Sequence, residues 1–172
     1  MSDSVLRGRV VLADSVIDDG VIEVRGGAIA RVVPASQYGP DLPDPTDSTF
    51  LPGLVDVHCH GGGGESFPNA ETPEEALVAV MEHRRHGTTS LVASCVTASA
   101  DVLRARAATL AGLAGRDEIA GIHFEGPFVS EARCGAQDPA YIVDPDPVLT
   151  RELLDICGGH ALSMTLAPEK PR

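Results

Sequence analysis

The sequence predicts an α/β protein: about the first four βα units of a (β/α)8 TIM barrel, preceded by part of a small β-sandwich domain. Three observations lead to this prediction. Short strand-like runs fill the start of the chain, strand and helix patterns alternate later, and a stretch rich in proline and aspartate separates the two regions. Alternating strands and helices are typical of right-handed βαβ units and a parallel sheet. We therefore expect two domains, residues 1–50 and residues 51–172.

Composition limits the kinds of partner. The formal net charge is −12, with 25 acidic and 13 basic residues. Such a surface is unsuited to nucleic acid or to an anionic membrane, whereas an anionic small substrate stays open because a local pocket can oppose the overall charge. The four cysteines are far apart in the sequence, and no apolar run is long enough for a transmembrane helix. Both features favour a reduced protein in the cytoplasm.

Short strands account for the first domain. The strand patterns cover residues 5–12, 21–25 and 28–33. Asp18-Asp19-Gly20 is a turn signal, and Gly26-Gly27 is a hairpin signal. Three strands are barely enough to fold alone, so we expect them to pack against another element. Residues 34–49 contain four prolines and read as a linker at the domain boundary.

A strand after Pro52-Gly53 carries the first chemically distinctive residues. Side chains alternate between the faces of a strand, so Asp56, His58 and His60 are expected on one face. The other face would hold three residues that suit packing against a helix: Val55, Val57 and Cys59. Two imidazoles at this spacing can reach one zinc ion at distances of about 2.0–2.1 Å.

Helix and strand patterns alternate from there. A helix is expected from the Thr72-Pro73 start signal to Gly87, and His83 and His86 should lie on its surface. Later helices should run from residue 99 or 101 to about 115, and over residues 148–157. The strands between them are expected over residues 88–96, 119–125 and 161–166.

Glu125 ends the strand over residues 119–125, where a carboxylate can bind metal together with imidazoles. The sites of (β/α)8 barrels lie at the carboxyl ends of the strands. We therefore expect His58, His60 and Glu125 to converge on one metal site. An open flavodoxin-like sheet is the structural alternative, but nothing in the sequence resembles its phosphate-binding loop.

Four motifs together resemble the amidohydrolase superfamily. Residues 52–61 (PGLVDVHCHG) are similar to its first barrel strand, and residues 86–89 (HGTT) to the approach to its second. Residues 123–128 (HFEGPF) and 166–169 (LAPE) narrow the resemblance to the N-acetylglucosamine-6-phosphate deacetylase family. The resemblance implies hydrolysis of N-acetyl-D-glucosamine 6-phosphate to glucosamine 6-phosphate and acetate, a step of amino-sugar catabolism.

The same resemblance implies roles for particular residues. His58, His60 and Glu125 would bind a divalent metal, expected to be zinc, and the histidine pair points to two ions bridged by Glu125. The following loop has Gln137 where many family members have a histidine that polarises the acetyl carbonyl. We therefore expect Gly135, Ala136 and Gln137 to contact the substrate. Gln137 can donate a hydrogen bond but carries no positive charge.

Family members supply further metal ligands and a catalytic aspartate from later barrel strands. The 172-residue chain is therefore expected to be an N-terminal portion that is inactive alone and prone to aggregate or oligomerise through exposed apolar surface. A full-length protein is expected to be a homo-oligomer. Two alternatives stay open: another amidohydrolase, of the dihydroorotase or adenine-deaminase type, and a non-catalytic remnant that binds metal or sugar.

Overall fold

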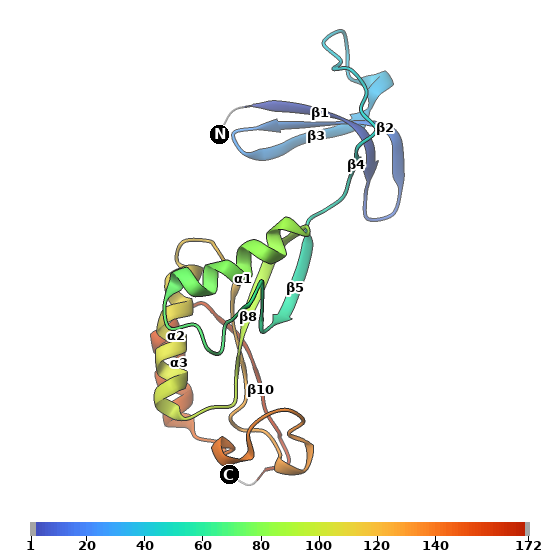
Figure 1. The fold of residues 1–172 in the computed structure, drawn as a ribbon. Coiled ribbons are helices and arrows are strands. Elements are labelled where there is room, and N and C mark those ends of the chain that lie inside the picture. Colours follow the sequence, from blue (N-terminus) through green and yellow to red (C-terminus); the bar gives the residue numbers. More distant parts are fainter. Residues whose placement is uncertain (1–2, 171–172) are drawn as a thin grey trace. The chain divides into compact units, whose positions relative to one another are not determined.

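The computed structural model describes residues 3–170, so the outer ends of the two expected domains, residues 1–2 and 171–172, lie outside it. The chain forms two compact units that divide between Pro52 and Gly53. The first unit is built from strands, and the second combines strands and helices (Figure 1). Among the described residues, no helix is long and apolar enough to cross a membrane.

The first unit is a four-stranded sheet with the order β3-β2-β1-β4. Adjacent strands are antiparallel except β4, which pairs parallel with β1. The hairpin expected at Gly26-Gly27 joins the second and third strands. The strands span β1 (Ser4–Val11), β2 (Val16–Arg25), β3 (Ala28–Pro34) and β4 (Thr49–Phe50).

The turn predicted at Asp18-Asp19-Gly20 is wrong, because these residues lie inside β2. The chain reverses earlier, where the backbone N–H of Leu12 donates to the carbonyl of Ser15 at 2.9 Å. Asp19 then lies beside Arg7 of the neighbouring strand, with 2.8 Å between Oδ1 and Nε. Pairing of opposite charges across the sheet thus favours strand over turn at this point.

The proline-rich stretch over residues 34–49 is not a free linker. It begins with the short 3-10 helix η1 (Ala35–Gln37) and ends in β4. Its backbone returns to β1: the N–H of Arg9 donates to the carbonyl of Ser48 at 3.0 Å, and the Arg7 guanidinium donates to the carbonyl of Pro43 at 2.8 Å. The stretch therefore supplies the fourth strand of the first unit.

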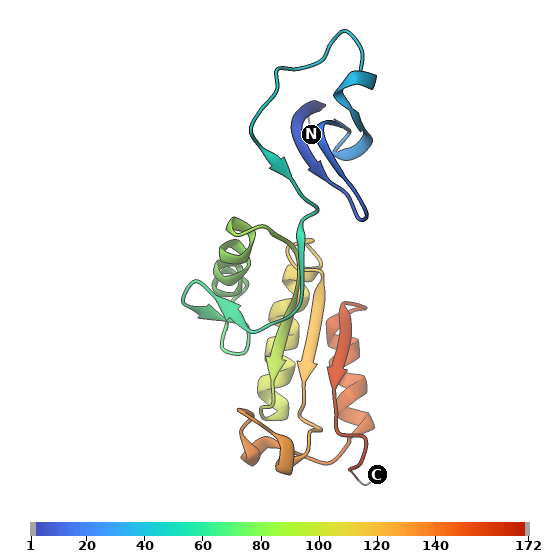
Figure 2. The same cartoon turned by 90° about the vertical axis from the view of Figure 1, so that its right-hand side faces the viewer.

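The second unit contains a parallel sheet with the order β10-β9-β8-β5. Helices cover one face of this sheet, and Figure 2 shows the open face turned toward the viewer. The strands are β5 (Leu54–Cys59), β8 (Thr88–Val96), β9 (Gly121–Glu125) and β10 (Ala161–Thr165). The helices are α1 (Pro73–Arg85), α2 (Ala100–Ala114) and α3 (Pro147–Cys157). The alternating strands and helices predicted from the sequence are confirmed.

Side-chain caps explain where the helices begin. The hydroxyl of Thr72 accepts a hydrogen bond from the N–H of Glu75 at 3.3 Å at the start of α1. Ser99 has the same role in α2, and Asp146 in α3. Two 3-10 turns, η2 (Glu131–Arg133) and η3 (Pro139–Tyr141), interrupt the long loop between β9 and α3.

The core of the second unit lies between the sheet and the helices. Its apolar side chains come from both layers and include Leu91, Leu103, Leu110, Ile122, Phe124 and Leu153. Cys95 and Cys157 are buried there, as core residues are expected to be. Burial raises the pKa of the Cys95 thiol to about 12 and that of Cys157 to about 11.

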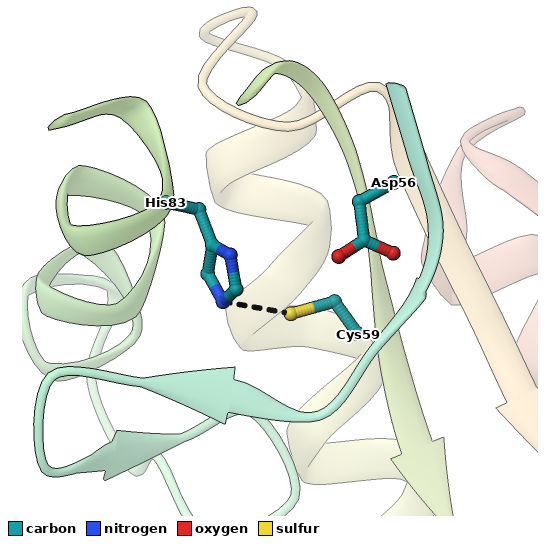
Figure 3. Close-up of side chains that lie close together, drawn as sticks. All are labelled: Asp56, Cys59 and His83. Carbon is teal, nitrogen blue, oxygen red and sulfur yellow. Dashed lines mark hydrogen bonds between the residues drawn. The ribbon is translucent and has the colours of Figure 1, made fainter. Parts of the chain in front are cut away.

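The pairing of β5 with β8 is irregular. Asp56 lies opposite Leu91, and Cys59 lies opposite Ala93, so three steps along β5 correspond to two along β8. An extra residue of this kind shifts the alternation of side chains by one position. Asp56 and Cys59 consequently lie on the same side of the strand, toward α1 (Figure 3).

This irregularity corrects two predictions. Asp56 does not share a face with His58 and His60, which meet Glu125 instead. Val55 and Val57 do not pack against a helix, because they are 67% and 68% exposed. The glycine run that follows the strand forms a short hairpin next to α1, made of β6 (Gly61–Gly62) and β7 (Glu65–Ser66).

Candidate metal centre

The carboxyl ends of β5 and β9 bring three candidate ligands together. The Nε2 atoms of His58 and His60 are 3.0 Å apart. The Oε2 atom of Glu125 lies 3.1 Å from Nε2 of His60 and 3.7 Å from Nε2 of His58. Only β8 separates the two strands in the sheet, so side chains from β5 and β9 can meet above it. Their role as metal ligands stays a prediction.

The donor atoms of this cluster fit a shared cation. Two ligands at about 2.0–2.1 Å from a tetrahedral zinc ion are separated by roughly 3.3 Å, which is close to the distances observed here. Two imidazole nitrogens and one carboxylate oxygen are donors that zinc accepts. The side chains of His58, His60 and Glu125 are 45%, 39% and 25% exposed, so the site is open to solvent and to a ligand.

A backbone contact fixes the ring of His60. Its Nδ1 atom lies 3.2 Å from the carbonyl oxygen of Ser94 in β8. A carbonyl oxygen can only accept a hydrogen bond, so Nδ1 carries the proton and Nε2 presents its lone pair to the cluster. This is the arrangement typical of histidines that bind a metal.

Gln137 and Thr97 hold Glu125 in place. Nε2 of Gln137 donates to Oε2 of Glu125 at 2.8 Å, and Oε1 of Gln137 accepts from the N–H of Thr97 at 2.7 Å. The Thr97 hydroxyl donates to the backbone carbonyl of Glu125 at 3.1 Å. Gly126 permits this contact, because a Cβ there would lie 2.1 Å from the Thr97 hydroxyl and the φ angle is +95°. The predicted contact of Gln137 with substrate stays a prediction.

His123 is a further neighbour of the cluster, and the sequence pattern predicts no role for it. It is buried, with Nδ1 3.0 Å from the hydroxyl of Ser94 and Nε2 2.8 Å from the hydroxyl of Thr165. Its ring meets that of His58 edge to face, with 4.6 Å between centroids. Burial lowers its pKa below the usual range, which favours the neutral ring. The available signal was its spacing, two residues before Glu125 on the same strand.

A pocket of about 490 Å³ opens beside the cluster. Its walls include His60, Thr97, Glu125 and the loop over residues 133–138. The three residues predicted to contact substrate, Gly135, Ala136 and Gln137, therefore line a pocket that also reaches two of the candidate ligands. This volume lies in the range of small-molecule sites.

The chain is similar to a known protein family and to several characterised relatives. Residues 49–171 match the amidohydrolase family. The N-acetylglucosamine-6-phosphate deacetylase of Bacillus subtilis (strain 168) is 35% identical over 174 residues, covering 94% of this chain and 43% of the relative. The N-acetylgalactosamine-6-phosphate deacetylase of Shewanella sp. (strain ANA-3) is 30% identical over 140 residues, covering 78% and 36%.

Solved structures show the same likeness. A mutant N-acetyl-D-glucosamine-6-phosphate deacetylase from Mycobacterium smegmatis, in complex with N-acetyl-D-glucosamine-6-phosphate, matches with a TM-score of 0.86 and 36% identity. The match covers 99% of this chain and 45% of that one. The corresponding enzyme from Pasteurella multocida matches with a TM-score of 0.79 at 20% identity, which shows likeness of fold. The chain spans less than half the length of these relatives.

Proposed function

This chain belongs to the amidohydrolase family, and we propose that it forms part of a metal-dependent N-acetylglucosamine-6-phosphate deacetylase. The reaction is hydrolysis of the N-acetyl group of N-acetyl-D-glucosamine 6-phosphate, which yields glucosamine 6-phosphate and acetate. One observation carries the proposal: His58, His60 and Glu125 converge beside a pocket in a chain similar to such deacetylases along nearly its whole length. The relatives' names favour this reaction over a dihydroorotase or an adenine deaminase.

We infer that the second unit contributes the first four βα units of a (β/α)8 barrel, within residues 51–172. The sequential strand order, the helices on one face and the cluster at the carboxyl strand ends support this inference. The exposed Val55 and Val57 would then face the barrel interior. The first unit, within residues 1–50, would be part of the small β-sandwich domain.

In the proposed site, His58, His60 and Glu125 would hold a divalent metal that we expect to be zinc, as one ion or two. The metal would supply Lewis acidity, which polarises a carbonyl and lowers the pKa of water. The chain itself orients the ligands. The carbonyl of Ser94 sets the tautomer of His60, and Gln137 sets the position of the Glu125 carboxylate.

Substrate would occupy the pocket beside Gly135, Ala136 and Gln137. The amide nitrogen of Gln137 has two hydrogens, and one is used in the bond to Glu125. The second hydrogen is free to donate to the acetyl carbonyl oxygen. A neutral donor at this position would stabilise developing negative charge less than a protonated histidine would.

N-acetylgalactosamine 6-phosphate is a second candidate substrate, favoured by the name of the Shewanella relative. The two sugars differ only in the configuration of one hydroxyl group, so both present the same acetamide to the metal site. We also propose a cytoplasmic location, which the four free cysteines support. Homo-oligomer formation stays a prediction.

The proposed function can be tested in a full-length chimeric enzyme that contains this chain. In a chimera, the chain replaces the matching part of the unmutated Mycobacterium smegmatis deacetylase, of which it covers 47%. We expect zinc-dependent acetate release from N-acetylglucosamine 6-phosphate and its loss in Glu125→Ala. Measuring N-acetylgalactosamine 6-phosphate in parallel separates the two substrates. A folded, zinc-loaded chimera that releases acetate from neither sugar would contradict the proposal.

The 172-residue chain alone is assayed beside the chimera. We expect no acetate release above that of its own Glu125→Ala variant. Turnover well above this control would show that the chain is sufficient for catalysis, and the expectation of inactivity would then be wrong.

A further inference from the structure

A second group of side chains of types that can bind metals lies on the opposite side of β5 from His58 and His60. Asp56 and Cys59 come from β5, and His83 comes from α1. Their candidate ligand atoms all lie within 4.8 Å of one another, and Figure 3 shows the three side chains pointing toward a common point. We name this group the β5–α1 cluster.

The prediction that His83 lies on the helix surface with His86 is wrong. Of the two rings, only that of His86 is exposed. His83 is half-buried, and its Nε2 atom lies 3.2 Å from Sγ of Cys59. The same nitrogen lies 3.0 Å from the carbonyl oxygen of Gly61, which can only accept, so Nε2 carries a proton in this structure that a bound ion would replace. This carbonyl oxygen is also 3.7 Å from Sγ of Cys59. A backbone oxygen therefore joins the three side chains as a fourth donor.

These distances suit one tetrahedral ion. With zinc–sulfur and zinc–nitrogen distances of about 2.3 and 2.0–2.1 Å, the two ligand atoms are separated by roughly 3.5 Å. The separation between Cys59 Sγ and His83 Nε2 is slightly shorter, at 3.2 Å. A thiolate, a carboxylate and a neutral imidazole around a divalent ion carry no net charge, which suits a site where Cys59 is only 5% exposed.

Strand β5, the β6–β7 hairpin and helix α1 together build the cluster. The irregular pairing of β5 turns Asp56 and Cys59 to the same side. The hairpin of β6 and β7 brings the Gly61 carbonyl toward α1. At Gly62 a Cβ would lie only 3.0 Å from Nε2 of His83, so the backbone approaches this ring closely.

We propose that Asp56, Cys59 and His83, together with the carbonyl oxygen of Gly61, bind a divalent metal ion of the zinc type, separate from the ion of His58 and His60. The sulfur and nitrogen donors favour a borderline-soft ion over magnesium or calcium. All four donors belong to the protein, as in structural zinc sites.

The ion would fasten the end of β5 to α1. Cys59 lies between His58 and His60 in sequence, so anchoring its side chain restricts the strand that presents both imidazoles. The inference does not depend on the proposed deacetylase function, because it rests on a different set of donor atoms.

The test is a cobalt titration of the 172-residue chain, followed by the near-ultraviolet charge-transfer absorption of a cobalt–thiolate bond. The cluster of His58, His60 and Glu125 contains no sulfur, so this band reports only on cysteine. We expect the band in the wild-type chain and its loss in Cys59→Ser. In His83→Gln the cobalt affinity measured from the band should fall by more than about tenfold.

Two variants serve as controls. Cys134→Ser removes a cysteine from the loop beside the pocket and should keep the band. Glu125→Gln alters the first cluster and should also keep it, so failure of the proposed function and failure of this inference give different results. Absence of the band in the wild-type chain would overturn the inference, as would a band that persists in Cys59→Ser.

Far-ultraviolet circular dichroism shows whether each variant folds. If Cys59→Ser does not fold, His83→Gln and Asp56→Asn carry the test, because both keep the thiol. An unchanged cobalt affinity in both of them would then overturn the proposed site.

Discussion

Gln137 donates a hydrogen bond of 2.8 Å to Oε2 of Glu125, the same carboxylate oxygen that faces His58 and His60. The N–H of Thr97 binds the other end of the amide, so the orientation of Gln137 is fixed. A residue twelve positions along the chain from Glu125 thus positions a candidate ligand. This relationship connects the pocket loop to the metal site, and it can be tested separately from catalysis.

Removing the donor of Gln137 should weaken metal binding. In Gln137→Leu the Glu125 carboxylate loses its hydrogen bond, and we expect zinc affinity to fall about 10- to 100-fold, as for other residues that support metal ligands. Competition with a chelator measures the affinity. Glu131→Gln, an exposed change in the same loop, is the matched control. Equal affinities in the two variants would show that Gln137 does not support the site.

Loss of a candidate ligand should weaken zinc binding more than Gln137→Leu does. We expect His60→Ala and Glu125→Ala to lose the zinc bound at the strand ends, because each removes one of three converging donors. The metal content of the purified chain, measured after dialysis, checks this. His86→Ala provides the comparison, since that ring is exposed and outside both clusters. Wild-type zinc content in the two ligand variants would exclude the proposed site.

A methyl group at Gly126 should disturb the site through the backbone. It would meet the Thr97 hydroxyl at 2.1 Å, at a φ angle of +95°. We expect Gly126→Ala to destabilise the second unit by about 1–3 kcal/mol. Gly112→Ala is the opposite case, because Gly112 lies in α2 with open space around it, and this change should stabilise the helix by about 0.5–1 kcal/mol. Urea unfolding followed by the helical dichroism signal compares both variants with wild type.

The buried thiols should make the folded chain less stable at alkaline pH. Burial raises the pKa of Cys95 to about 12 and of Cys157 to about 11, from an ordinary value of 9.0. As pH rises, the unfolded chain therefore loses these protons first, so their contribution to stability is complete below about pH 9 and declines above it. Between pH 9 and its pKa in the folded chain, each thiol should lower the free energy of unfolding by about 1.4 kcal/mol per pH unit.

The double variant Cys95→Ala with Cys157→Ala isolates this effect. Its absolute stability will be lower, because two cavities form in the core. Its stability should nevertheless decline less steeply than that of wild type between pH 9 and 11. Urea midpoints at several pH values give the two slopes, and parallel slopes would show that these thiols do not cause the decline.

Much of the second unit could be predicted because its signals are local. Thr72, Ser99 and Asp146 cap their helices through their own side chains, and these helices begin at the adjacent residues. The segments between them contain short apolar runs, and β8 is also rich in β-branched residues, so the sequence predicts these strands as well. The turn expected at Asp18-Asp19-Gly20 failed because Arg7, on another strand, pairs with Asp19.

The amino-acid sequence by itself determined the alternation of strands and helices, and it identified His58, His60 and Glu125 as a coherent donor set. Tertiary structure alone decided which side chains share a face of β5. One extra residue in its pairing with β8 turned Asp56 toward Cys59 and His83. Side-chain alternation is a local rule, but strand register depends on hydrogen bonds to a segment more than 30 residues away. For the same reason, only the folded chain shows Gln137 supporting Glu125 and His83 reaching Cys59.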